Sequence, residues 1–218
     1  MPLIRLENAP REAFARLLLA HGAGASAQTP FMRTMAQLLA DQGIECLRFD
    51  FAYMAARSEG GSRRPPPRAE RLRDEYRAAV ADVPAGLPLL IGGKSMGGRV
   101  ASLVADELHE TGRIAGLVCL GYPFHPPNKP EQLRTAHLME LRSPTLIVQG
   151  ERDPFGPRDE VEPMQLSSAI RFHWLGDGDH DFGPRGGSGF TRKGNLASAA
   201  EAVAVFAREV CSGASGHR

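Results

Sequence analysis

The chain of 218 residues has few of the features that mark several classes of protein. Its three cysteines, Cys46, Cys119 and Cys211, are too few and too scattered for a disulfide framework or a zinc ribbon. The formal net charge is only +1, so the composition gives no reason to expect a nucleic-acid partner. No apolar run approaches the roughly 20 residues of a membrane-spanning helix, so we expect no membrane partner.

The first ten residues, MPLIRLENAP, lack the charged start and the apolar core of a signal peptide. We therefore expect a cytoplasmic protein. The length suits one compact domain over residues 1–218, and we find no repeat and no interdomain linker.

Short aliphatic segments alternate with longer amphipathic ones along the chain. The segments that we predict as strands are 15–21, 44–51, 87–93, 114–122, 144–150 and 170–176. They are almost continuously apolar, as is typical of strands that are covered on both faces. The predicted helices are 31–43, 68–83, 95–112 and 196–210. This order predicts an α/β fold with a mainly parallel sheet between two helical layers.

Three segments break this alternation and are expected to be loops. They are 55–70, 123–135 and 183–194. The first is rich in Gly, Pro and Arg, and the third is rich in Gly. None is long enough to form a lid domain.

The stretch LLIGGKSMGGRVASLV offers two functional interpretations. A phosphate-binding loop needs Gly, four residues and then Gly-Lys-Ser, because its backbone amides surround the phosphates. The first Gly would be residue 88, which is Pro88, and the residues that follow are strand-like. The nucleotide-binding interpretation therefore fails.

The same residues satisfy Gly-x-Ser-x-Gly, with Ser95 between Gly93 and Gly97, placed between a strand and a helix. This context is typical of a nucleophile elbow, in which a sharp and strained turn exposes the serine. The small residues on either side leave room for that turn. We therefore predict that Ser95 is a nucleophile.

A serine nucleophile needs a base, and the base needs an acid that orients it. In this kind of fold the chain order is serine, acid, histidine, with the last two on loops after strands. Asp153 follows the predicted strand 144–150, and His180 follows the strand 170–176. We predict Asp153 as the acid and His180 as the base.

Other residues compete for both roles. Glu151 follows the same strand as Asp153. We prefer Asp153 because it stands three residues after the end of that strand and precedes a proline, which is the usual position of the acid in the family that the chain resembles, as described below. Asp159 is a weaker candidate because it falls in the next helix. His173 lies inside a predicted strand, where we expect it to be packed.

The aspartates Asp177, Asp179 and Asp181 alternate around His180, as in a calcium loop. The sixth position of such a loop must be Gly and is Phe182, and the terminal Glu is missing. We therefore expect these aspartates to form turns, and we expect no metal and no other cofactor.

The oxyanion of an acyl intermediate needs backbone N–H donors. We assign these to Met96, at the start of the helix after the elbow, and to Ala23, in the loop His21-Gly22-Ala23-Gly24, where small side chains leave the backbone accessible. Gly24 is the neighbouring possibility for the second donor. His21 is expected to be a structural hydrogen-bonding group.

Several side chains on loops at this end of the sheet are candidates for the pocket. Core packing beneath the loops is the alternative for each aromatic one. Lys94 adjoins the nucleophile and either favours an anionic substrate or forms a salt bridge. With Gly24 and Lys94, the candidate pocket residues are Phe51, Tyr53, Phe124, His125 and Phe155.

The segments HGAGA, RFDFAYM, GGKSMGGRVAS, GYPFHPP and GERDPFG together resemble the α/β-hydrolase superfamily, and more narrowly its small, lidless α/β-hydrolase-like family. The chain is also similar in size to dienelactone hydrolases, which usually have a cysteine where this chain has Ser95. The resemblance implies hydrolysis of a small-molecule acyl ester or thioester through an acyl-enzyme. We expect a monomer or a homodimer.

The narrower family also includes a region of a chromatin acetyltransferase-complex subunit. A binding or scaffold protein without turnover is therefore the alternative function, because a fold alone does not settle function. A transferase or haloperoxidase-like use of the same triad is a third interpretation.

Overall fold

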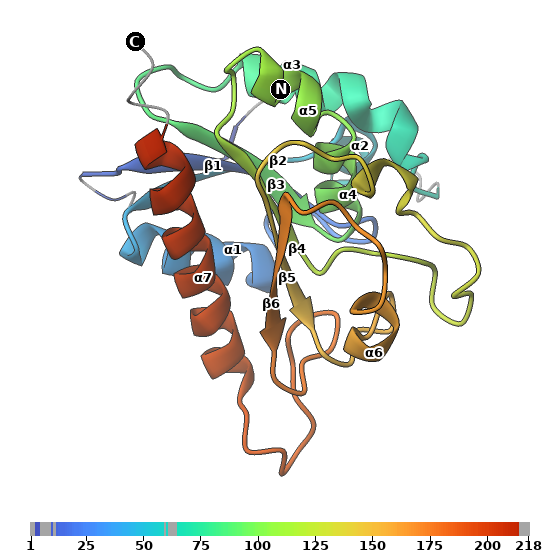
Figure 1. The fold of residues 1–218 in the computed structure, drawn as a ribbon. Helices are drawn as coiled ribbons and strands as arrows, with labels where there is room; N and C mark the ends of the chain where they lie inside the picture. The colour runs from blue at the N-terminus through green and yellow to red at the C-terminus, as the bar shows by residue number, and fades with distance from the viewer. Residues whose placement is uncertain (1–2, 5–9, 11, 59, 61–64, 214–218) are drawn as a thin grey trace.

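The computed structural model describes residues 3–4, 10, 12–58, 60 and 65–213. In this part of the chain a six-stranded parallel sheet has the order β2-β1-β3-β4-β5-β6, as Figure 1 shows. The strands are β1 (Ala15–Ala20), β2 (Ile44–Phe49), β3 (Leu89–Lys94), β4 (Gly116–Leu120), β5 (Thr145–Gly150) and β6 (Ile170–Leu175). The predicted parallel sheet is confirmed.

The strand order positions the functional loops. From β1 the chain goes to β2 at one edge of the sheet and then returns to β3 on the other side of β1. The strand order therefore reverses between β1 and β3, where Ala20 lies opposite Gly93. In open α/β sheets, ligands bind outside the carboxyl ends of the strands at such a switch point.

Helices cover both faces of the sheet, as predicted. On one face lie α1 (Pro30–Asp41) and α7 (Arg192–Gly213), side by side in Figure 1. The other face carries α3 (Arg73–Ala81), α4 (Met96–Ser102) and α5 (Ala105–Glu110). The other described helical segments are α2 (Ala52–Ser58), α6 (Arg158–Val161) and the 3-10 turns Ala69–Leu72 and Ala136–Leu138. Among the described residues, no helix combines the length and the apolar content that spanning a bilayer requires.

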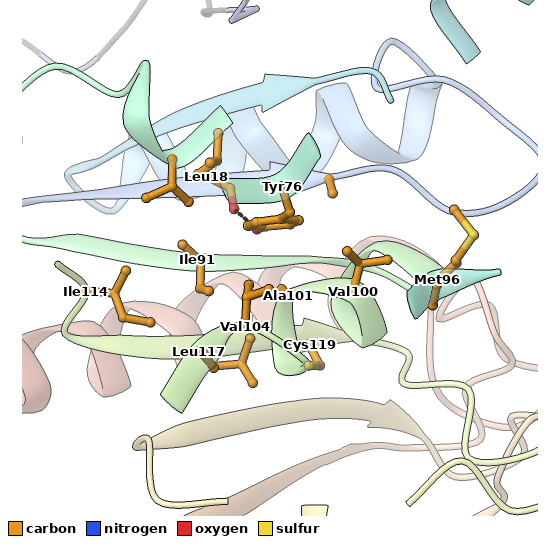
Figure 2. Close-up of a cluster of buried hydrophobic side chains, with 14 of the residues drawn as sticks. Leu18, Tyr76, Ile91, Met96, Val100, Ala101, Val104, Ile114, Leu117 and Cys119 are labelled. Carbon is orange, nitrogen blue, oxygen red and sulfur yellow. Dashed lines mark hydrogen bonds between the residues drawn. The ribbon is translucent and has the colours of Figure 1, made fainter. Parts of the chain in front are cut away.

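Alternate residues of each central strand enter two separate cores. In β1, Leu18 packs toward α3 and α4, whereas Leu17 packs toward α1 and α7. Figure 2 shows part of the first core, where Tyr76 of α3 lies over the sheet. The Tyr76 hydroxyl oxygen is 3.1 Å from Leu18 O and 2.7 Å from Gly92 O, and it accepts the Gly92 N–H. This buried phenol bridges β1 and β3 beneath the loops that follow them.

Strand β6 departs from the prediction that every strand is covered on both faces. Its end residues Ile170 and Leu175 are buried, whereas Arg171 is exposed and the three residues between are half-buried. Its aromatic residues Phe172 and Trp174 stack on each other, and Arg158 of α6 lies over the Trp174 ring. Its apolar sequence therefore reflects local aromatic packing and not burial on both faces.

Three predicted boundaries are also wrong. The helix predicted over 95–112 is two helices, because the chain turns at Leu103 and Val104 between α4 and α5. The loop predicted over 55–70 is helical at both ends, in α2 and in the 3-10 turn, while 59 and 61–64 lie outside the described residues. Helix α7 begins at Arg192, inside the loop predicted to continue to residue 194.

Candidate active site

Ser95 stands on a strained turn between β3 and α4. Its backbone has φ 53° and ψ −118°, in a region that non-glycine residues rarely adopt. A Cβ atom on Gly93 would lie 2.5 Å from the Gly97 carbonyl carbon and 2.7 Å from Ala20 O. A Cβ atom on Gly97 would lie 2.5 Å from the same Ala20 oxygen. Both motif glycines are therefore required by the close approach of β1, and the strained serine is the one that the motif predicts.

Asp153 and His180 form a hydrogen-bonded pair at the carboxyl ends of β5 and β6. The distance from Asp153 Oδ2 to His180 Nδ1 is 2.7 Å, and the carboxylate is fully buried. The other carboxylate oxygen accepts the Phe155 N–H at 2.9 Å, and the Phe155 ring lies 4.3 Å from the imidazole ring. Because Nδ1 donates to the carboxylate, Nε2 is the acceptor nitrogen of the neutral imidazole.

The competing acids and bases have other partners. Glu151 accepts hydrogen bonds from Arg158 and from the Asp177 N–H. His173 lies on the edge strand β6, with its Nε2 2.8 Å from Ser198 Oγ. Asp159 is on α6. Of the acids and bases considered from the sequence, the fold joins Asp153 to His180.

Ser95 and His180 line the same cavity, of about 460 Å³, together with Lys94 and Phe31. We call this cavity the histidine lobe. No hydrogen bond connects the Ser95 hydroxyl to the His180 ring in the described part of the structure. Such bonds are often long in the free enzyme and shorten when substrate binds. The fold thus brings the serine and the His–Asp pair to one cavity.

The two predicted oxyanion donors flank Ser95. Met96 is the first residue of α4, and Ala23 lies in the loop after β1. Within the described residues, neither N–H donates a hydrogen bond, and both residues line a second cavity with Ser95, of about 510 Å³. The Tyr53 hydroxyl donates to Ala23 O at 2.9 Å and fixes this loop.

His21 has the structural role that its position suggests. Its Nδ1 donates to Gly22 O at 2.6 Å, and its Nε2 accepts the Phe51 N–H at 3.1 Å. Burial lowers the pKa of His21, which favours the neutral ring that this pair of bonds requires. Its imidazole therefore connects the loop after β1 to the chain after β2.

Four of the predicted pocket residues line neither cavity. Phe51 and Phe124 are fully buried in the core beneath the loops. His125 is buried as well and pairs with Glu160 at 3.0 Å. Tyr53 supports the Ala23 loop instead of forming a wall. Phe51 and Phe124 are therefore core residues, Tyr53 supports a loop, and His125 faces α6.

Three predicted pocket residues do line the cavities. Phe155 lines both, and Gly24 lines the histidine lobe. Lys94 is also in the histidine lobe, with its Nζ 3.4 Å from Asp181 Oδ1 and 5.3 Å from the centre of the Phe31 ring. Burial lowers the pKa of the Lys94 ammonium, and the nearby Asp181 opposes this shift. Lys94 thus forms the salt bridge that was one of its two interpretations.

The remaining aspartates near His180 hold the loop together. Asp179 Oδ1 accepts the N–H groups of Asp181 and Gly183, at 2.9 and 2.8 Å. Asp177 pairs with Arg185 and Arg152, and the Arg185 guanidinium lowers the pKa of this carboxyl to about 2. Among the described residues, no group of three or more His, Cys, Asp or Glu side chains is placed so that it could bind a metal ion.

Gln149 is a site residue that the sequence analysis missed. Its side chain is fully buried at the end of β5, where its Oε1 accepts the Tyr122 N–H at 2.7 Å. Its Nε2 lies 3.1 Å from Asp153 Oδ2 and 3.2 Å from both Tyr122 O and Gly156 O. The amide therefore positions the Asp153 carboxylate. A signal was present, since Gln149 is polar in the otherwise apolar segment TLIVQG.

Arg99 and Arg134, which line the second cavity, were also missed. This cavity adjoins Ser95 on the side of Ala23 and Met96, and we call it the arginine lobe. Its charged lining residues are Arg68, Arg99, Arg134 and Glu70. Ser95, Ala23 and Phe155 line both lobes, so Ser95 stands where the lobes meet.

Known proteins of this architecture are similar over most of the chain. One similar structure is a Xanthomonas campestris protein described as an α/β serine hydrolase without a lid. It is 17% identical, its TM-score is 0.68, and the match covers 95% of this chain and 87% of that protein. A dienelactone hydrolase from Anabaena variabilis is 23% identical, with a TM-score of 0.67 and coverage of 92% and 88%. The esterase domain of a Rhodothermus marinus protein is 19% identical, with a TM-score of 0.62 and coverage of 95% and 98%.

These structures share the fold of this chain. Family membership follows from the sequence, because a model described as an alpha/beta hydrolase domain matches residues 13–208. The match includes the elbow, the Asp153–His180 pair and the loop after β1. The chain therefore belongs to the alpha/beta hydrolase domain family.

Proposed function

We propose that this protein is a serine hydrolase that cleaves a small acyl ester or thioester through an acyl-enzyme. The observation that carries the proposal is the 2.7 Å Asp153–His180 pair, which opens on the cavity that the strained Ser95 also lines. A weak hydroxyl nucleophile needs such a base, and the base needs the buried acid. Solved structures of this fold that are described as an esterase and a dienelactone hydrolase support ester chemistry.

In the first half-reaction, His180 Nε2 takes the Ser95 hydroxyl proton while Oγ attacks the carbonyl carbon. Asp153 stabilises the imidazolium that forms, and the N–H groups of Met96 and Ala23 donate to the oxyanion. The carbonyl then reforms as the bond to the leaving group breaks, and His180 gives its proton to that group. In the second half-reaction, His180 deprotonates a water that attacks the acyl-enzyme, and the Ser95 hydroxyl is restored.

The test is labelling by a fluorophosphonate probe, which reacts with activated serines. Wild-type protein should be labelled, Ser95→Ala should not, and His180→Ala should be labelled slower by roughly two orders of magnitude or more. His173→Ala is the matched control, since His173 is a half-buried histidine bonded to Ser198, and it should react at the wild-type rate. A folded wild-type protein that stays unlabelled would contradict the proposal and favour a binding or scaffold role.

A further inference from the structure

The arginine lobe has more cationic donors than the described residues can match with acceptors. Its charged lining consists of Arg68, Arg99, Arg134 and Glu70. Glu70 pairs with Arg99 at 2.5 Å, which leaves two guanidinium charges without a carboxylate in the described part of the lobe. Lys94 does not add to this excess, because it lines the other lobe and pairs with Asp181.

Arg134 is the guanidinium best placed to bind a ligand. Its backbone is fixed, since its N–H donates to Phe124 O at 2.8 Å and its carbonyl accepts the Tyr122 hydroxyl at 2.9 Å. The side chain is half-buried and has no carboxylate within ion-pair distance among the described residues. Burial and the charge of Arg99 both lower the pKa of Arg134, and the more distant Glu70 carboxylate only partly opposes this shift.

Arg99 is the second arginine of this lobe and lies close to Ser95. It lies one turn after Ser95 in α4, and its N–H donates to Ser95 O at 3.1 Å. Its Nε atom is buried and has no hydrogen-bond partner within the described residues. Guanidinium groups bind carboxylates through paired N–H donors, and Arg99 already donates one N–H, from Nη2, to Glu70.

The chemistry of the site decides which part of a substrate enters this lobe. The leaving group must lie beside His180, because His180 gives it a proton, and His180 lines the histidine lobe. The acyl part then extends to the other side of Ser95, past the N–H groups of Met96 and Ala23, into the arginine lobe. An anionic group on the acyl part would meet the unmatched guanidinium charges there.

We propose that the preferred acyl group carries a carboxylate at the end remote from the scissile carbonyl, as in a half-ester or half-thioester of a short dicarboxylic acid. Arg134 and Arg99 bind that carboxylate, and Arg68 at the rim adds to the attraction. This inference rests on the proposed function, because it takes Ser95 as the nucleophile and His180 as the acid for the leaving group.

The first test compares the para-nitrophenyl ester of valeric acid with the para-nitrophenyl half-ester of glutaric acid. The two acyl chains have the same length and differ in the terminal carboxylate. Wild-type kcat/KM should be at least roughly tenfold higher for the glutarate half-ester, as expected for hydrogen bonds to a charged group. Arg134→Gln should reduce this ratio by about tenfold, while Arg192→Gln, on the histidine lobe, should leave the ratio unchanged.

A binding measurement separates the two proposals. Ser95→Ala protein is titrated in a calorimeter with monoethyl glutarate and with ethyl valerate, and monoethyl glutarate should bind at least roughly tenfold more tightly. In the double variant Ser95→Ala/Arg134→Gln this difference in affinity should be lost. Charge-selective binding without Ser95-dependent turnover would overturn the hydrolase function and keep the anion site. Ser95-dependent turnover with a ratio near one, or with a ratio that Arg134→Gln does not change, would overturn the anion site alone.

Discussion

Replacing Gln149 by Met tests whether one buried amide supports the candidate triad. Met has a similar volume but makes none of the four hydrogen bonds of the Gln149 side chain. The buried Tyr122 N–H would lose its acceptor, at about 1–3 kcal/mol, and the Asp153 carboxylate would lose a donor, at about 1.5–3 kcal/mol. The free energy of unfolding should therefore fall by about 2.5–6 kcal/mol, a large part of the roughly 5–15 kcal/mol typical of a domain.

Urea denaturation followed by circular dichroism measures this loss. Gln37→Met is the matched control, because Gln37 is exposed on α1 and bonds only to Asp41, so its free energy of unfolding should change by less than about 0.5 kcal/mol. At urea concentrations where Gln149→Met is folded, fluorophosphonate labelling should slow by roughly tenfold or more, because Asp153 and His180 are less well oriented. Wild-type stability and a wild-type labelling rate in Gln149→Met would refute the positioning role.

Two further predictions concern the backbone and the pH dependence of stability. Gly93→Ala should lower the free energy of unfolding by at least about 2 kcal/mol, because the added Cβ would collide with backbone atoms of β1 and α4. Gly24→Ala is the control, since no atom lies within 4 Å of its added Cβ, and the same urea titration should show almost no change. Burial and the charge of Arg99 lower the pKa of His137 to about 4 from 6.5, so below pH 6.5 the unfolded chain binds a proton that the folded protein does not. Between pH 6.5 and 4, the free energy of unfolding should fall by about 1–2 kcal/mol more for the wild type than for His137→Gln, after allowance for solvent screening. Equal pH dependence of the two proteins in the same urea titration would contradict the lowered pKa of His137.

Most of the fold was predictable because it is encoded by local patterns. The buried strands have continuous apolar runs, and the turn around Ser95 needs Gly at fixed offsets, so both can be read from a few adjacent residues. The exposure of β6 could not be read in this way. Its aromatic residues resemble those of a buried strand, and their partial exposure is seen only in the tertiary structure.

Some residues of the candidate site can likewise be predicted from the local sequence, whereas others cannot. Gln149 precedes Asp153 by four residues, and a polar residue within an apolar strand is a local sign that its side chain has a partner. By contrast, Arg99 and Arg134 are 35 positions apart in the sequence (134 minus 99), on α4 and on the loop that follows β4. Nothing near either arginine indicates that they share a cavity, or that Glu70 neutralises only one of them. The charge of the arginine lobe, and with it the inferred substrate class, therefore follows from tertiary structure.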